Sequence, residues 1–282
     1  MKLVTFEGGG KVSWGVVQGD GIVDMGARLG TRYPDVKAVL AADAQAEVAA
    51  AAKGAKPDWK LATVTLLPPI GNPDKILCVG INYDEHRVET GRQKSDHPVI
   101  FTRFADTQVG HGQSLVKPRS SERFDYEGEL ALVIGRPGRH IPEATALAHI
   151  AGYACYNDGS VRDWQRHTHQ FTPGKNFPGT GGFGPWLVTA DEVPDPFKLT
   201  LTTRLNGEEV QKATTDMMIF NIRQLIAYIS GFTHLRAGDV IVTGTPGGVG
   251  DRRNPPLYMK PGDTVEVEIS GVGLLRNSVV AE

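Results

Sequence analysis

The strongest constraint on the fold is a succession of short apolar segments that begins at Lys75 and continues to the end of the chain. Glycine-rich or polar turns separate these segments, whose length and β-branched or aromatic content are typical of strands. They read "KILCVGI", "PVIFTRF", "GELALVIG", "HIAGYACYND", "GPWLVT", "KLTLTTRLNG", "DVIVTGTP" and "DTVEVEISGVGLL". Helical spacing of apolar residues is confined to 217–235 and, more weakly, to 141–150. The sequence therefore predicts an α+β chain that is mostly β.

The first 70 residues differ from the rest and suggest a small N-terminal α+β domain. Short strands broken by "EGGGK" and "QGDG" come first, and an alanine-rich stretch follows. We expect one helix there, with Asp35 near its start and Gly54 at its end. The segment "PPIGNPDK" then marks a boundary, so the predicted domains are 1–70 and 71–282.

Composition excludes several classes of partner. The formal net charge is -2, which suggests neither nucleic acid nor an anionic membrane surface as partner. The apolar runs are too short to span a bilayer, and the N-terminus lacks the apolar core of a signal peptide. Cys78 and Cys155 lie in apolar stretches and are expected to be buried free thiols. We therefore expect a cytoplasmic protein that acts on a small molecule.

Two carboxylates stand out in "FDYEGELALVIG", residues 124–135, which is expected to be one strand. The two-residue period of a strand places Glu127 and Glu129 on the same face, in an otherwise apolar setting. Burying one isolated carboxylate carries an idealised cost on the order of 20 kcal/mol, and two neighbours also repel. A bound divalent cation removes both penalties.

Asp158 offers a third carboxylate at the end of the apolar strand "GYACYND". Three oxygen ligands favour a hard ion, and a site that leaves room for water or substrate suits Mg²⁺ or Mn²⁺ best. The alternative is structural: Glu127 and Glu129 lie on a solvent-facing edge strand, and Asp158 caps a turn.

Two further groups of polar residues have the chemistry of an active site. His86 and Glu89 are three residues apart, so one helical turn makes them a plausible general base, or else a surface pair. A loop carrying Arg162, Gln165 and Lys175 suits a small anionic substrate, unless it is an ordinary solvated loop.

The glycine-rich turn "VTGTPGGVG" lacks the ending of a nucleotide-binding loop, but Thr245 and its backbone N–H groups could bind a carboxylate. His167 and His169 are interpreted as loop histidines rather than metal ligands. No Gly-X-Ser-X-Gly motif indicates a serine hydrolase.

Taken in order, these segments resemble the fumarylacetoacetate hydrolase family over about residues 72–282. The resemblance is carried by "KILCVGINYDEH", "FDYEGELALVIG", "GYACYNDGSVRDWQ", "GKNFPGTGGFGPWLVT", "LNGEEVQ" and "DVIVTGTPGGVG". It implies a mixed β-sandwich or β-roll, usually a homodimer. Two positions depart from the family pattern, Arg103 where a lysine is expected and Pro178 where many members have Asp.

The resemblance also implies roles for the candidate residues. Glu127, Glu129 and Asp158 would hold Mg²⁺ or Mn²⁺, with Ca²⁺ also compatible. The catalytic group would be His86 and Glu89, a water-activating pair on a lid segment, with Lys175 as the active-site lysine. Arg162, Gln165 and Thr245 would contact the substrate.

The expected activity is cleavage of the C–C bond of a 2,4-dioxo acid, an acylpyruvate, to pyruvate and a second acid, in the catabolism of aromatic compounds. Decarboxylation of oxaloacetate, or isomerisation or hydration of an unsaturated 2-oxo acid, passes through the same kind of enolate, so these reactions stay open as alternatives. A non-catalytic role, with the N-terminal domain as an interaction module, is the other class of hypothesis.

Overall fold

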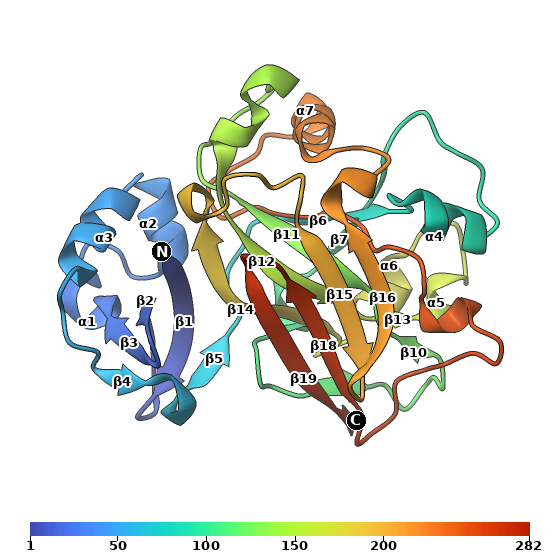
Figure 1. Cartoon of the computed structure of the whole chain (residues 1–282), viewed down its shortest axis with the longest axis horizontal. Helices are drawn as coiled ribbons and strands as arrows, with labels where there is room; N and C mark the ends of the chain where they lie inside the picture. Colours follow the sequence, from blue (N-terminus) through green and yellow to red (C-terminus); the bar gives the residue numbers. More distant parts are fainter.

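The computed structural model describes all 282 residues, and two β-sheets form the framework of the fold (Figure 1). The larger sheet has twelve strands, and its main path runs β4-β3-β2-β1-β14-β12-β11-β17-β6-β7. The strands on this path are β1 (Lys2–Gly8), β2 (Lys11–Gln18), β3 (Gly21–Asp24), β4 (Trp59–Lys60), β6 (Ile76–Gly80), β7 (Val99–Arg103), β11 (Gly128–Ile134), β12 (Ile150–Asp158), β14 (Gly181–Thr189) and β17 (Val240–Val242). Two short strands join it from the side, β5 (Thr65–Leu67) on β1 and β8 (Gln108–Val109) on β14.

The second sheet has five strands in the order β16-β15-β18-β19-β9 and packs against β11, β12 and β14 (Figure 1). Its strands are β9 (Leu115–Lys117), β15 (Thr200–Leu205), β16 (Glu208–Thr214), β18 (Thr264–Ile269) and β19 (Gly273–Ala281). Leu130 and Leu132 of β11 meet Leu201, Val267 and Leu275 of this sheet in one apolar core. The predicted mostly β fold, with two packed sheets, is therefore confirmed.

Strand β11 is buried on both faces, as its sequence predicts. Leu130 and Leu132 point into the core between the sheets, while Ala131 and Val133 belong to a second core on the opposite face. All seven residues of the strand are buried. A carboxylate on this strand therefore lies inside the protein, which excludes the solvent-facing edge strand.

The prediction of one strand over residues 124–135 is wrong in its detail. The chain forms β10 (Phe124–Asp125), paired with β13 (Ser160–Val161), and resumes as β11 only at Gly128. Between them, Tyr126 N–H donates to Asp125 Oδ1 and Glu127 N–H to Asn157 Oδ1. Here the backbone N–H groups donate to side-chain oxygens instead of to the carbonyl groups of a neighbouring strand. The periodicity of the sequence does not reveal such a change of hydrogen-bond partner.

The alanine-rich segment forms two helices rather than the predicted one. These are α2 (Val36–Ala41), which Asp35 caps through Ala38 N–H, and α3 (Gln45–Ala52). Asp43 lies between them at a φ of 50°, a left-handed conformation that interrupts the helical hydrogen bonds and that Asp tolerates better than most residues.

Two helices are expected in residues 71–282, and the structure contains one of them as an α-helix. Helix α7 (Ile222–Phe232) confirms one of them, and Asn221 and Gln224 form its capping box. The weaker pattern at 141–150 gives only the 3₁₀ segment η3 (Glu143–His149).

The N-terminal residues extend the main sheet. Strand β1 pairs with β14 through Lys2↔Val188 and Leu3↔Leu187, and the core on that side is shared with the helices of the first 70 residues. In Figure 1 these helices and strands lie beside β14. The domain boundary near residue 70 and the homodimer stay predictions.

None of the helices has the length and hydropathy that a membrane crossing requires.

Candidate active site

Three acidic side chains converge where β11 begins and β12 ends. Glu127 and Glu129 flank the first residue of β11, and Asp158 is the last residue of β12. All three are buried, and one carboxylate oxygen from each lies within 4.8 Å of the others. The structure thus brings together the three residues that the sequence predicted as a metal site.

Gly128 explains why the two glutamates can share this position. A Cβ atom at residue 128 would lie 1.9 Å from Thr203 Oγ1 of the second sheet, so only glycine fits between the sheets there. The backbone is thereby pressed against β15, and the flanking carboxylates point to the opposite side. Glu129 Oε2 then accepts a hydrogen bond of 2.5 Å from Gly244 N–H.

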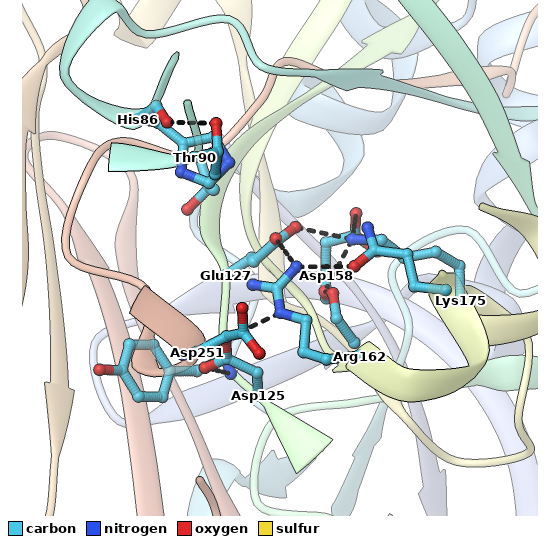
Figure 2. A network of polar contacts seen from close by, with 12 residues as sticks. His86, Thr90, Asp125, Glu127, Asp158, Arg162, Lys175 and Asp251 are labelled. Carbon is cyan, nitrogen blue, oxygen red and sulfur yellow. Dashed lines mark hydrogen bonds and ion pairs between the residues drawn. The ribbon is translucent and has the colours of Figure 1, made fainter. Parts of the chain in front are cut away.

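Two cationic side chains approach this cluster, Lys175, which Figure 2 labels, and Arg103. Lys175, at the end of α6 (Thr172–Lys175), places Nζ 2.6 Å from Glu127 Oε2 and 2.7 Å from Asp158 Oδ2. Arg103 of β7 places Nη1 2.6 Å from Asp158 Oδ1, while its Nη2 donates to Thr180 Oγ1. Arg103 thus holds one oxygen of Asp158 and leaves the other facing Lys175.

A third cation, Arg162 of α5 (Arg162–Gln165), pairs with the other oxygen of the Glu127 carboxylate (Figure 2). Its Nε donates to Asp125 Oδ2 over 2.8 Å, and its Nη1 lies 2.6 Å from Glu127 Oε1 and 3.0 Å from Gln165 Oε1. Arg162 Nη2 is buried and has no hydrogen-bond partner. Arg162 lines the cavity described below, so its guanidinium brings positive charge to a site that suits an anionic ligand.

The electrostatics of the three carboxylates are unequal. Burial opposes the charge of Glu127, but Arg162 and Lys175 still hold its pKa below the ordinary value. Glu129 has no cationic partner, and burial, reinforced by Asp158 and Glu127, raises its pKa well above the ordinary value. Lys175 stays charged, because Asp158 and Glu127 outweigh the effect of burial and raise its pKa.

This charge distribution fits a divalent cation. With all four buried carboxylates ionised, Asp125 included, the three cationic side chains Arg103, Arg162 and Lys175 leave an excess of one negative charge. A hard divalent ion would compensate Glu129 and leave the cluster with one positive charge, which suits an anionic ligand. The all-oxygen donor set favours Mg²⁺ or Mn²⁺ over zinc.

His86 and Glu89 form the pair predicted from their spacing. Both lie on α4 (Asp84–Glu89), with His86 Nδ1 and Glu89 Oε1 2.6 Å apart. The other oxygen of Glu89 accepts a hydrogen bond of 3.0 Å from Gly248 N–H, and this bond fixes the carboxylate. The Glu89 carboxylate accepts a hydrogen bond from Nδ1 and so keeps the imidazole proton on that nitrogen. In neutral His86, Nε2 therefore carries no proton and can accept one.

A cavity of about 660 Å³ joins the cluster and the His86–Glu89 pair. Seven of the nine predicted site residues line it: His86, Glu127, Glu129, Arg162, Gln165, Lys175 and Thr245. Asp158 lies behind Lys175, and Glu89 lies behind His86. His167 and His169 also line the cavity but lie outside the acidic cluster, in agreement with their interpretation as loop residues.

Sequence reasoning did not assign Asp125 or Gln211 to the site. Asp125 orients Arg162, and it alternates with Glu127 and Glu129, so the same period could have identified it. Gln211, on a strand of the other sheet, donates to Thr245 Oγ1. No local pattern in the sequence predicts that contact.

Comparison with known proteins identifies the family. A sequence model described as fumarylacetoacetate (FAA) hydrolase C-terminal matches residues 75–280. The human mitochondrial oxaloacetate tautomerase FAHD2A is 45% identical over 219 residues, which cover 77% of this chain and 70% of that protein.

Solved structures agree over the whole chain. A candidate HpcE protein from Mycobacterium smegmatis has a TM-score of 0.89 at 38% identity, covering 100% of this chain and 99% of that one. Maleylpyruvate hydrolase from Sphingobium sp. SYK-6, solved with manganese(II) and pyruvate, has a TM-score of 0.83 at 30% identity, covering 100% and 99%. As the sequence motifs predicted, the chain belongs to the fumarylacetoacetate hydrolase family.

Proposed function

We propose that this chain is a divalent-cation-dependent enzyme that interconverts the keto and enol forms of a short 2-oxo dicarboxylic acid such as oxaloacetate. The observation that carries the proposal is the cavity in which the buried carboxylate cluster, Arg162 and His86 meet. The 45% identity to an oxaloacetate tautomerase supports this choice of reaction.

The three carboxylates Glu127, Glu129 and Asp158 would hold Mg²⁺ or Mn²⁺, and the ion would act as a Lewis acid toward the oxygens of the 2-oxo acid. Arg162 would attract a substrate carboxylate through its positive charge, while Asp125 and Glu127 fix the position of its guanidinium. Lys175 adds positive charge next to the developing enolate.

Proton transfer is assigned to His86. Its Nε2 takes the proton from C3 of the keto acid as the C2–C3 double bond forms, and the imidazolium then returns that proton to the oxygen at C2. Glu89 stabilises the imidazolium that results, because its carboxylate is already bonded to Nδ1. The reverse sequence returns the keto form, so no water is consumed.

Cleavage of the C–C bond of an acylpyruvate is the second candidate. The His86–Glu89 pair on the cavity wall favours it, because the same pair can take a proton from water that attacks the 4-carbonyl. The structural similarity to maleylpyruvate hydrolase also supports this reaction.

A parallel assay separates the two reactions. Chelator-treated protein is reloaded with Mg²⁺ or Mn²⁺ and given enol-oxaloacetate, whose ultraviolet absorbance reports tautomerisation, or an acylpyruvate, from which pyruvate release is measured. We expect the parent protein to remove the enol absorbance faster than the Glu129→Gln variant does at the same ion concentration. Pyruvate release from the acylpyruvate without any effect on the enol would assign the hydrolase instead. Inactivity toward both substrates would contradict the proposal.

A further inference from the structure

Gln211 belongs to the second sheet, yet its amide reaches the segment that carries two of the three acidic ligands. The side chain is 2% exposed and lies on β16. Its Oε1 accepts from Gly128 N–H over 2.9 Å. Its Nε2 donates to Thr245 Oγ1 over 2.8 Å and to Pro246 O over 3.0 Å.

The backbone N–H groups of residues 127 and 128 donate to side chains and not to a neighbouring strand. At the break between β10 and β11, Glu127 N–H donates to Asn157 Oδ1 and Gly128 N–H to Gln211 Oε1. Both N–H groups are buried, so removal of either amide oxygen would leave a donor without a partner. Two side-chain amides therefore fix the backbone on which Glu127 and Glu129 stand.

The amide of Gln211 has one allowed orientation. A flip would turn its NH₂ group toward Gly128 N–H, which is also a donor. With the amide in place, Thr245 Oγ1 receives a hydrogen bond from Gln211 and donates its own proton to Gly128 O over 3.0 Å. Gly128, Gln211 and Thr245 thus form a closed cycle that joins the acidic ligands to the loop after β17.

We propose that Gln211 is a positioning residue of the active site, an inference that rests on the proposed function. Its oxygen fixes the segment 127–129 for cation binding, and its NH₂ group fixes Thr245 for the 2-oxo acid. Gln211 does not line the cavity, so it acts through Gly128 and Thr245.

Two substitutions test the oxygen and the NH₂ group of the Gln211 amide separately. Gln211→Met has similar length but neither hydrogen-bonding group, whereas Gln211→Glu keeps the oxygen that accepts from Gly128 and loses the donor to Thr245. Thr202→Val is the matched control, because Thr202 lies on β15 opposite Lys212, the neighbour of Gln211, is buried, and points away from Gly128 by the two-residue period of the strand.

The measurements are calorimetric titrations of chelator-treated protein with Mn²⁺, and of the Mn²⁺-loaded protein with oxalate. Gln211→Met should weaken Mn²⁺ binding by about tenfold or more, as expected for loss of a group that orients a metal ligand. Gln211→Glu should keep Mn²⁺ binding within about threefold of the parent but weaken oxalate binding by about tenfold. Thr202→Val should match the parent in both titrations, and thermal unfolding in chelator reports the global stability of each variant.

Mn²⁺ binding by Gln211→Met at the parent affinity would overturn the inference, as would equal losses in Gln211→Met and Thr202→Val. If Gln211→Met fails to fold, Gln211→Glu decides, and undiminished oxalate binding by that variant contradicts the proposal. A parent chain that binds no Mn²⁺ would overturn the proposed function itself, which distinguishes the two failures.

Discussion

Glu129 is the carboxylate whose surroundings depend most on a bound cation. It is 1% exposed, accepts one hydrogen bond from Gly244 N–H, and lies beside two other acidic residues. Glu127 and Asp158 each have cationic partners, while Glu129 has none. Its negative charge therefore disfavours the folded state unless a cation is present.

Glu129→Gln should separate folding from function. The substitution removes the buried charge, so in chelator the variant should unfold at a denaturant concentration equal to or above that of the parent. Added Mn²⁺ should stabilise the parent but not the variant, because the ligand is lost. Chemical denaturation followed by circular dichroism, with and without Mn²⁺, provides the test. A variant that is markedly less stable than the parent in chelator would show that Glu129 has a structural partner.

His86→Ala should impair proton transfer and leave cation binding intact. His86 touches Glu89 and the cavity but lies outside the acidic cluster. Loss of a general base typically costs about 10²–10⁴-fold in rate. We therefore expect kcat to fall by about 100-fold or more, with the Mn²⁺ affinity unchanged. A variant with the parent's kcat would assign the base elsewhere.

At the scale of elements, the start of β11 depends on close contact between the two sheets. Gly128 is the contact point, since the nearest atom to a Cβ there would be Thr203 Oγ1 at 1.9 Å and the next Thr203 Cβ at 3.3 Å. The position of Glu127 and Glu129 therefore depends on a residue of a different sheet.

Gly128→Ala should destabilise the fold by about 1–3 kcal/mol, the usual cost of overpacking a core. The double variant Gly128→Ala/Thr203→Ala should recover much of this loss, because it removes the clashing hydroxyl. Urea unfolding of the parent, the single variants and the double variant forms the required cycle. Additive effects of the two substitutions would show that the sheets do not meet at this point.

Sequence patterns located the strands and the acidic cluster. A two-residue period in apolar surroundings indicated the strand that carries Glu129 and the shared face of Glu127 and Glu129, and the end of a second apolar strand indicated Asp158. The patterns failed where side chains replace backbone partners, as at Tyr126 and Glu127, and where Asp43 adopts a left-handed conformation. The contacts Arg103–Asp158 and Gln211–Gly128 join residues far apart in sequence, so only the fold reveals them.

At the scale of the whole molecule, the first 70 residues share a sheet and a core with the rest. Leu3 and Leu187 pair across β1 and β14, and Val39 of α2 lies in the same apolar cluster as Ala131 and Val133. The chain is thus connected through a continuous sheet from β4 to β7.

Thermal unfolding of the full chain should therefore be a single cooperative transition. A shared core couples the unfolding of the two parts, and their calorimetric and van't Hoff enthalpies should agree. Differential scanning calorimetry in chelator tests this expectation. Two resolved transitions would instead show that residues 1–70 fold as an independent domain.

The central claim is that Glu127, Glu129 and Asp158 hold one divalent cation. The most direct test is a calorimetric titration of chelator-treated protein with Mn²⁺ or Mg²⁺, with Asp158→Asn measured in parallel. We predict one ion per chain for the parent and greatly weakened binding for the variant. Absence of binding by the parent, or equal binding by both proteins, would contradict the claim.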